Sequence, residues 1–256
     1  MKLKGAPRHP MRVLRLSARG ALMAVFLGLP SLAAGEMIVS ARYVDPTDRY
    51  PHGVLGDPSE YTTLEVTTSE GALHRRTWAR PIVYEDTAPR IVDVDGDGAP
   101  ELLVVKSHEQ FGAQFQILRL RDGQLESMVS NPFIGTRFRW LGIVGAADLD
   151  GDGFVEVAYV GRPHLAKTLR VWRVVPVDDE STRVEEIATL AGVTNHRIGE
   201  EDIAGGIRDC GAGPEMIVAD AAWQRILAVR FEDGGLVTAD LGPHRGRASF
   251  AEVMTC

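Results

Sequence analysis

The chain has 256 residues, of which 45% are hydrophobic and 25% are charged, so it is long enough to bury a core as one all-β domain. Its formal net charge is −7. An acidic chain repels nucleic-acid phosphates, so a nucleic-acid partner is not expected.

The first 34 residues have the pattern of a secretory signal peptide. Basic residues without any acid precede the apolar run ALMAVFLGLPSLAA at 21–34, which ends in small residues. This run is shorter than the roughly 20 residues of a membrane span. An uncleaved anchor is the alternative. We therefore predict a signal peptide at 1–34, an exported mature domain at 35–256 in the periplasm or outside the cell, and no transmembrane segment after signal removal.

Four segments of the mature chain share one pattern, an apolar strand, a turn rich in Gly or Asp, and a second apolar strand. They begin at His52, Arg90, Val144 and Ala204. Asp93 and Asp148, at matching places in the second and third segments, are 55 residues apart. Self-similarity at this period indicates a repeat architecture.

Each of the last three segments is followed by two further strand-like runs. Asp122-Gly123 and Asp233-Gly234 lie within such runs and predict tight hairpins. No run has a sustained period of 3.6 residues, so helices are not expected. Units of four antiparallel strands at this spacing predict the blades of a β-propeller, whose stacking buries both faces of each sheet.

The two ends of the chain resemble pieces of one further unit. FAEVMTC at 250–256 resembles the start of a unit, and GEMIVSARYVD at 35–45 resembles its second strand. A last blade built from both termini would close the ring and give about five blades, with four or six as alternatives. A β-sandwich with two acidic loops is the competing fold.

Two cysteines occur at matching places in the repeat. The alignment puts Cys256 at the position of Cys210, on the inner strands of adjacent blades. An exported chain can keep a disulfide, provided that the two Cα atoms lie within about 7 Å. We predict this pair as a candidate disulfide, with two unpaired thiols as the alternative.

Two loops, DVDGDGAPE at 93–101 and DLDGDGFVE at 148–156, place carboxylates at positions 1, 3, 5 and 9. Four such groups close together repel each other unless a cation lies between them. Calcium takes six to eight oxygen ligands, which favours two calcium sites completed by the carbonyls at position 7. The predicted ligands are Asp93, Asp95, Asp97, Ala99, Glu101, Asp148, Asp150, Asp152, Phe154 and Glu156.

Neither loop is an EF-hand, because position 12 is Val104 or Tyr159 rather than Glu and the flanks are strands. In the last segment, Asp209 and Glu215 are the only carboxylates left at the four positions. We predict no metal site there.

With these loops the chain resembles the FG-GAP/VCBS repeat proteins, to which integrin-type β-propellers are related. The resemblance covers roughly residues 50–240. It implies a propeller with calcium in the outer parts of its blades, held by the eight carboxylates named above, and often a role in adhesion or ligand binding outside the cytoplasm. The first and fourth segments lack full loops, which departs from the family pattern.

No catalytic motif is visible in the sequence. Four histidines, His52, His164, His196 and His244, lie in similar loop-like strings. They would line one face of the ring and bind a metal or an anion, or would simply be polar residues between blades. The favoured function is a non-catalytic, calcium-binding module for an unknown protein or glycan partner. The alternatives are an extracellular propeller enzyme acting on a polysaccharide and a structural subunit of a surface assembly.

Overall fold

The computed structural model describes Met1 and residues 36–56, 59–178 and 181–256. The predicted signal peptide at 1–34 lies, apart from Met1, outside the described residues. The rest of the chain, from Ala34 to Cys256, is one compact unit. Its described part is all-β with several antiparallel sheets, as predicted, and contains one helix, α1 (Arg247–Met254).

The first sheet contains eight strands in the order β1-β2-β4-β6-β7-β8, with β3 beside β2 and β5 beside β6. Its strands are β1 (Ile38–Thr47), β2 (Glu60–Thr68), β3 (Leu73–Thr77), β4 (Ile82–Tyr84), β5 (Arg90–Val92), β6 (Glu101–His108), β7 (Gly112–Arg121) and β8 (Gln124–Ser130). Strands β5 to β8 are a four-stranded antiparallel group that matches one predicted unit.

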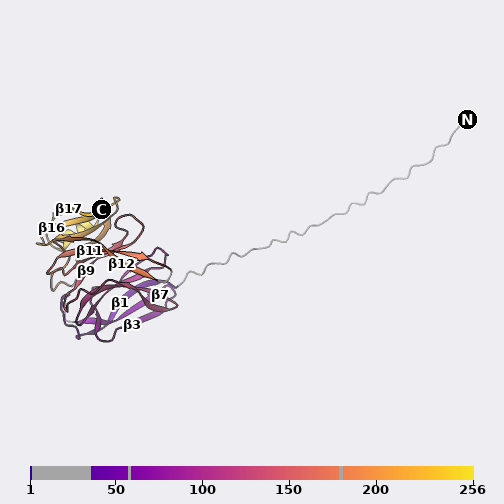
Figure 1. The fold of residues 1–256 in the computed structure, drawn as a ribbon, viewed down its shortest axis with the longest axis horizontal. Coiled ribbons are helices and arrows are strands. Elements are labelled where there is room, and N and C mark those ends of the chain that lie inside the picture. The colour runs from indigo at the N-terminus through magenta and orange to yellow at the C-terminus, as the bar shows by residue number, and fades with distance from the viewer. Residues whose placement is uncertain (2–35, 57–58, 179–180) are drawn as a thin grey trace. The chain divides into compact units, whose positions relative to one another are not determined.

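The second and third sheets each contain a further unit of four consecutive antiparallel strands. The second sheet is β9 (Leu141–Ala147), β10 (Glu156–Gly161), β11 (Thr168–Pro176) and β12 (Thr182–Ala191). The third is β14 (Gly206–Asp209), β15 (Pro214–Asp220), β16 (Arg225–Glu232) and β17 (Gly235–Pro243), with β13 (Val193–Thr194) beside β15. In Figure 1, β1, β3 and β7 lie at one end of the ribbon, β9, β11 and β12 lie next, and β16 and β17 lie at the other end.

Both predicted hairpins form where the Asp-Gly pairs stand. Asp122 and Gly123 have φ values of 51° and 71° between β7 and β8. Asp233 and Gly234, with φ values of 50° and 78°, join β16 to β17. Positive φ at both central residues is what a two-residue hairpin turn requires, and glycine supplies it without steric cost.

The second strand of each unit buries both of its faces. In β10, Val157 and Tyr159 pack toward the first sheet, whereas Ala158 and Val160 pack toward the third. Strand β6 also packs on both of its faces. Its Leu103 belongs to the core that β6 shares with β10. Successive side chains of a strand point to opposite faces, so an unbroken apolar strand indicates a sheet packed between two neighbours.

The C-terminal segment is a helix, so the prediction that it supplies a strand is wrong. Residues Phe250, Val253 and Met254 of α1 have the i, i+3, i+4 spacing of one helical face, and they pack on the outer face of the third sheet against Ile217. Burial of this face outweighs the weak strand-like alternation of FAEVMTC. The last unit is therefore not completed by a strand from each terminus.

The first predicted unit also differs from the others. Its expected first strand is a turn at Val54 and Leu55, both of which pack against the core between the first two sheets. Strand β1 pairs instead with β2 over most of its length.

No helix among the described residues has both the length and the apolar character needed to span a membrane.

Candidate functional site

The loop at 93–101 connects β5 to β6, and its first carboxylate organises its backbone. Asp93 accepts hydrogen bonds from the backbone N–H groups of Gly96, at 2.7 Å, and Gly98, at 3.0 Å. These glycines have φ values of 77° and 86°, a region that side chains with a Cβ rarely adopt. The loop therefore curls around the Asp93 carboxylate.

The remaining carboxylates of this loop also cap its backbone. Asp97 donates its N–H to Asp95 at 3.3 Å and accepts from the N–H of Ala99 at 2.7 Å. Glu101 is buried and accepts from the N–H of Val94 at 2.9 Å. Val94 itself is buried in the core, so it anchors the tip of the loop to the sheets.

The loop at 148–156 between β9 and β10 repeats these contacts at the same positions. Asp148 accepts from Gly151 at 2.7 Å and from Gly153 at 3.0 Å. Glu156 accepts from the N–H of the buried Leu149 at 2.8 Å. The two loops, 55 residues apart, thus have one geometry because they have one sequence pattern.

Each loop brings three carboxylates together, each offering one oxygen within 4.8 Å of the other two. These residues are Asp93, Asp95 and Glu101 in the first loop and Asp148, Asp150 and Glu156 in the second. The predicted ligands Asp97 and Asp152 lie in the same loops outside these triplets, and the carbonyls of Ala99 and Phe154 stay a prediction. Three convergent hard oxygens fit a calcium ion.

Like charge and burial both act on these carboxylates. Burial, followed by the charges of the three loop aspartates, raises the pKa of Glu101 to about 7, against the opposing effect of the Val94 N–H. Burial also raises the pKa of Asp95, with smaller contributions from Asp97 and Asp93. In the second loop burial raises the pKa of Glu156, although the hydrogen bond from Arg173 opposes it.

Arg173 on β11 contacts the second loop. Its Nε donates to Glu156 Oε1 at 2.8 Å, one terminal nitrogen lies 2.8 Å from Asp152 Oδ2, and the other contacts Asp150. One guanidinium therefore offsets three carboxylates of the loop. The sequence analysis did not identify this residue.

The strand register shows why an arginine lies there. Arg173 is paired directly with Glu156 across β10 and β11. The pairing of Leu102 with Leu118, continued by one residue, puts Arg119 opposite Glu101. In the first loop Arg119 lines a cavity of about 160 Å³ together with Asp95, Asp97 and Glu101.

The third turn keeps the bend but has different chemistry. Asp209 accepts from the N–H groups of Gly211 and Gly213, at 2.7 and 3.2 Å. Glu215 contacts an arginine instead of converging with other carboxylates. Arg208 Nε donates to its Oε1 at 2.6 Å.

Cys210 in this turn forms the predicted disulfide with Cys256, with the Cα atoms 5.5 Å apart. The reason given for the pairing needs correction, because Cys256 follows the helix α1 and not an inner strand. The bridge therefore fastens the end of α1 to the third turn.

Replacing both cysteines by serine is expected to lower the free energy of unfolding by about 4 kcal/mol, because the bridge closes a loop between residues 46 apart. Phe250 of α1 still packs on the third sheet without the bridge, so the fold should persist. Urea denaturation measures the loss, and the reduced parent protein should show the same loss. An unchanged unfolding midpoint in both samples would contradict this expectation.

Comparison with known proteins identifies part of the chain. Residues 88–159 match the model of the FG-GAP-like repeat, and this segment contains both acidic loops. None of the curated proteins compared matches the chain. A crystal structure of rhamnogalacturonan lyase YesW is similar with a TM-score of 0.34 and 18% identity, over 75% of this chain and 44% of that one. The chain spans less than half of that structure's chain, and a likeness at this level carries no argument about function.

Proposed function

We propose that residues 35–256, of which 88–159 match an FG-GAP-like repeat, are an exported, calcium-binding module that acts by binding a partner rather than by catalysis. The observation that supports this best is the pair of loops with the same geometry, each with three convergent carboxylates. The partner we expect is a protein or a glycan outside the cytoplasm.

Calcium would hold the loops by the oxygens that already converge. In the first loop these belong to Asp93, Asp95 and Glu101. Asp97 and the carbonyl of Ala99 would supply further oxygens, and the second loop would use the matching residues. An ion at this position offsets the repulsion among the carboxylates and stiffens the turn, because calcium binds many oxygens at once.

The fold and the disulfide support the two remaining parts of the proposal. Stacked four-stranded units in which β6, β10 and β15 bury both faces are what a β-propeller requires. A closed ring of blades is part of this proposal, but the composite blade that gave the count of five is not formed. The Cys210–Cys256 bridge favours an oxidising compartment, in agreement with export by a signal peptide at 1–34.

Calcium titration of the mature protein by calorimetry tests the proposal. We expect two sites with dissociation constants of about 10⁻⁴–10⁻³ M, as in other extracellular modules. Asp95→Ala should remove the first site and Asp150→Ala the second, and each should reduce the rise in melting temperature that calcium gives the parent.

Asp209→Ala is the matched control, because Asp209 caps the third turn in the same way but without a carboxylate triplet. It should leave the number of calcium sites unchanged. If the Asp95→Ala and Asp150→Ala variants titrate like the parent, the loops do not bind calcium.

A further inference from the structure

A pocket of about 280 Å³ lies outside the acidic loops and is lined by two imidazoles and two guanidiniums. These belong to His52, Arg139, Arg162 and His164. Among the described residues that line it, none is Asp or Glu. A concave site with cationic groups and no carboxylate on its walls attracts anions.

The other walls of the pocket are apolar. Phe138 and Trp140 contribute aromatic rings, and Pro163 lies beside His164. Leu165 and Ile198 stand at the rim with 63% and 71% of their surface exposed. Large apolar side chains that are exposed together around a pocket indicate a binding surface rather than ordinary scatter.

Strand β10 separates this pocket from the second acidic loop. The strand begins at Glu156, in the loop, and ends at Gly161, next to Arg162 of the pocket. At about 3.3 Å per residue the two sites lie about 17 Å apart along the strand. The pocket therefore does not share residues with the proposed calcium sites.

A buried polar network supports the His52 wall from behind. The Glu85 side chain is completely buried and contacts both His52 Nδ1 and the Ser107 hydroxyl. The Trp140 indole N–H donates to the Glu85 carbonyl at 2.8 Å. A buried carboxylate is costly and is kept where it positions another group. Here it fixes the ring of His52 by one nitrogen, so Nε2 points away from Glu85.

Two lining residues have backbone conformations that are rare for side chains of their size. Phe138 has φ of 58° and Arg162 has φ of 50°. The N–H of Phe138 donates to the Tyr50 hydroxyl at 2.9 Å, and the N–H of Arg162 donates to the Trp140 carbonyl at 2.8 Å. Backbone strain that the surroundings enforce is concentrated at functional sites.

His164 contributes a neutral ring. Burial, followed by the neighbouring imidazoles of His196 and His52, lowers the pKa of His164 to about 4. His196 Nε2 donates to the Glu200 carbonyl at 2.8 Å, so in its neutral form its Nδ1 accepts from His164 Nε2 at 2.9 Å. The positive charge of the pocket therefore comes from Arg139 and Arg162.

We propose that this pocket binds a small organic anion that carries a carboxylate on an apolar ring. Arg139 and Arg162 receive the carboxylate, because guanidinium groups match its planar geometry. Phe138, Trp140 and Leu165 contact the ring. This inference goes beyond the proposed function, since it involves a different site and needs no calcium.

Benzoate is a suitable probe for this site. The pocket volume of about 280 Å³ leaves room for a small aromatic carboxylate. Benzyl alcohol keeps the ring without the charge, and inorganic phosphate keeps the charge without the ring. Comparing the three probes therefore tests the contribution of the carboxylate and the contribution of the ring separately.

The test is a titration of the ¹⁵N-labelled protein, in EDTA, followed through its tryptophan indole N–H resonances. Benzoate should shift the Trp140 signal, assigned with Trp140→Phe, with a dissociation constant of about 1 mM. The signal of Trp223, which packs against His244 and Phe250, should not move. Benzyl alcohol and phosphate should each bind at least tenfold more weakly than benzoate.

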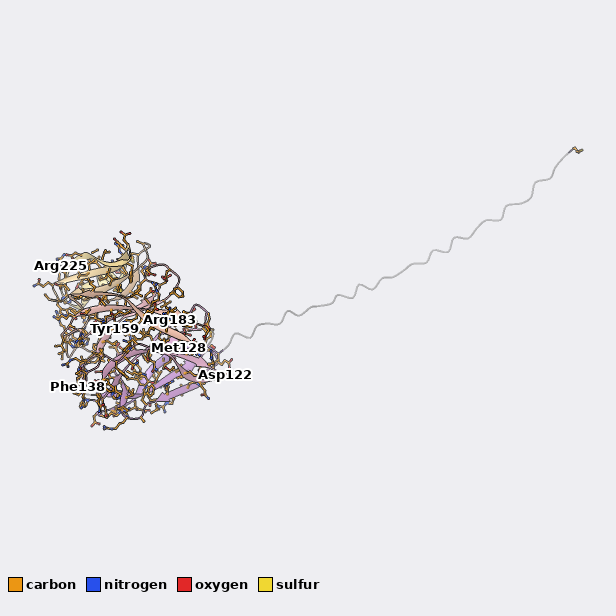
Figure 2. The ribbon with its side chains drawn as sticks, in the orientation of Figure 1. Asp122, Met128, Phe138, Tyr159, Arg183 and Arg225 are labelled. Carbon is orange, nitrogen blue, oxygen red and sulfur yellow. A yellow bond between two sulfur atoms is a disulfide. The ribbon has the colours of Figure 1, made fainter. Side chains whose placement is uncertain are left out.

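The double variant Arg139→Ala/Arg162→Ala should weaken benzoate binding at least tenfold. Arg139→Lys/Arg162→Lys, which retains the charges but not the planar guanidinium groups, should bind benzoate with intermediate affinity, and its melting curve controls for folding. Arg183→Ala is the matched control, because Arg183 lies well apart from Phe138 in Figure 2 and pairs with Glu185. Equal binding of phosphate and benzoate, no shift at Trp140, or parent-like binding by the double alanine variant would overturn the proposal.

Discussion

Replacing His52 by alanine is expected to lower the free energy of unfolding by about 1 to 3 kcal/mol, which is typical when a buried polar group loses its hydrogen-bond partner. The change leaves the carboxylate of Glu85, which is completely buried, with the Ser107 hydroxyl as its remaining side-chain partner. It also removes a ring that stacks on Phe138 with centroids 5.1 Å apart. Equilibrium denaturation in urea at pH 7 measures the loss.

The loss should grow as pH rises. Burial raises the pKa of Glu85, with a smaller contribution from Asp86, and the contacts with His52 and Ser107 oppose this shift. Without His52 the pKa of the folded state rises further, while that of the unfolded chain stays near 4.3. An acid whose pKa is raised on folding stabilises the fold below the unfolded pKa and loses that contribution as pH rises through the folded pKa. His52→Ala should therefore be closer to the parent at pH 5 than at pH 8.

His74→Ala is the matched control, because His74 also pairs with a glutamate, Glu36, at 3.1 Å, but at the surface. Its effect on stability should be much smaller and nearly independent of pH. The double variant His52→Ala/Glu85→Gln should be more stable than His52→Ala, because it no longer buries a charge. If His52→Ala and His74→Ala have the same effect, then the Glu85 network does not hold the pocket wall as we describe.

The sequence predicted the parts of the fold that local chemistry decides. Asp122-Gly123 and Asp233-Gly234 give hairpins because few residue pairs tolerate positive φ twice in a row. The stacking of four-stranded units predicts sheets buried on both faces, and β10 is buried along its whole length. The prediction of a strand for the C-terminal segment was wrong because tertiary packing decides the conformation of this segment. Phe250 is buried against the third sheet as part of a helix, and this burial stabilises the helix over an extended strand.

The candidate sites differ in how far sequence reasoning reaches. The triplets such as Asp148, Asp150 and Glu156 lie within nine residues, so their spacing alone suggested convergence. Arg173 was missed because its contact depends on the register of a long hairpin. The sequence did contain a signal for this contact. In each unit an arginine stands opposite the glutamate of the turn, namely Arg119, Arg173 and Arg230. The pocket joins His52 to His164 across more than a hundred residues. In the sequence, only the similar loop-like segments around these two histidines pointed to the pocket.

Replacing Arg173 by leucine is expected to tighten calcium binding at the loop 148–156 by about 10- to 100-fold. The guanidinium donates to Glu156 and contacts Asp150 and Asp152, so a calcium ion must first displace it. Charge-assisted hydrogen bonds contribute about 1.5–3 kcal/mol, and 1.4 kcal/mol corresponds to a tenfold change in affinity. Leucine keeps part of the apolar stem, so the packing of β11 should survive.

The same variant should have the opposite effect in EDTA. Without the guanidinium or an ion, the three carboxylates repel each other around a buried Glu156, so the melting temperature of the calcium-free protein should fall. Arg230→Leu is the matched control, because Arg230 lies 3.9 Å from Glu215 in the third unit, where no carboxylate triplet exists. It should change neither calcium affinity nor the difference between the two melting temperatures. Calorimetry and thermal melts with and without calcium measure both effects. Weaker calcium binding in Arg173→Leu would mean that the arginine supports the ion, and would contradict this expectation.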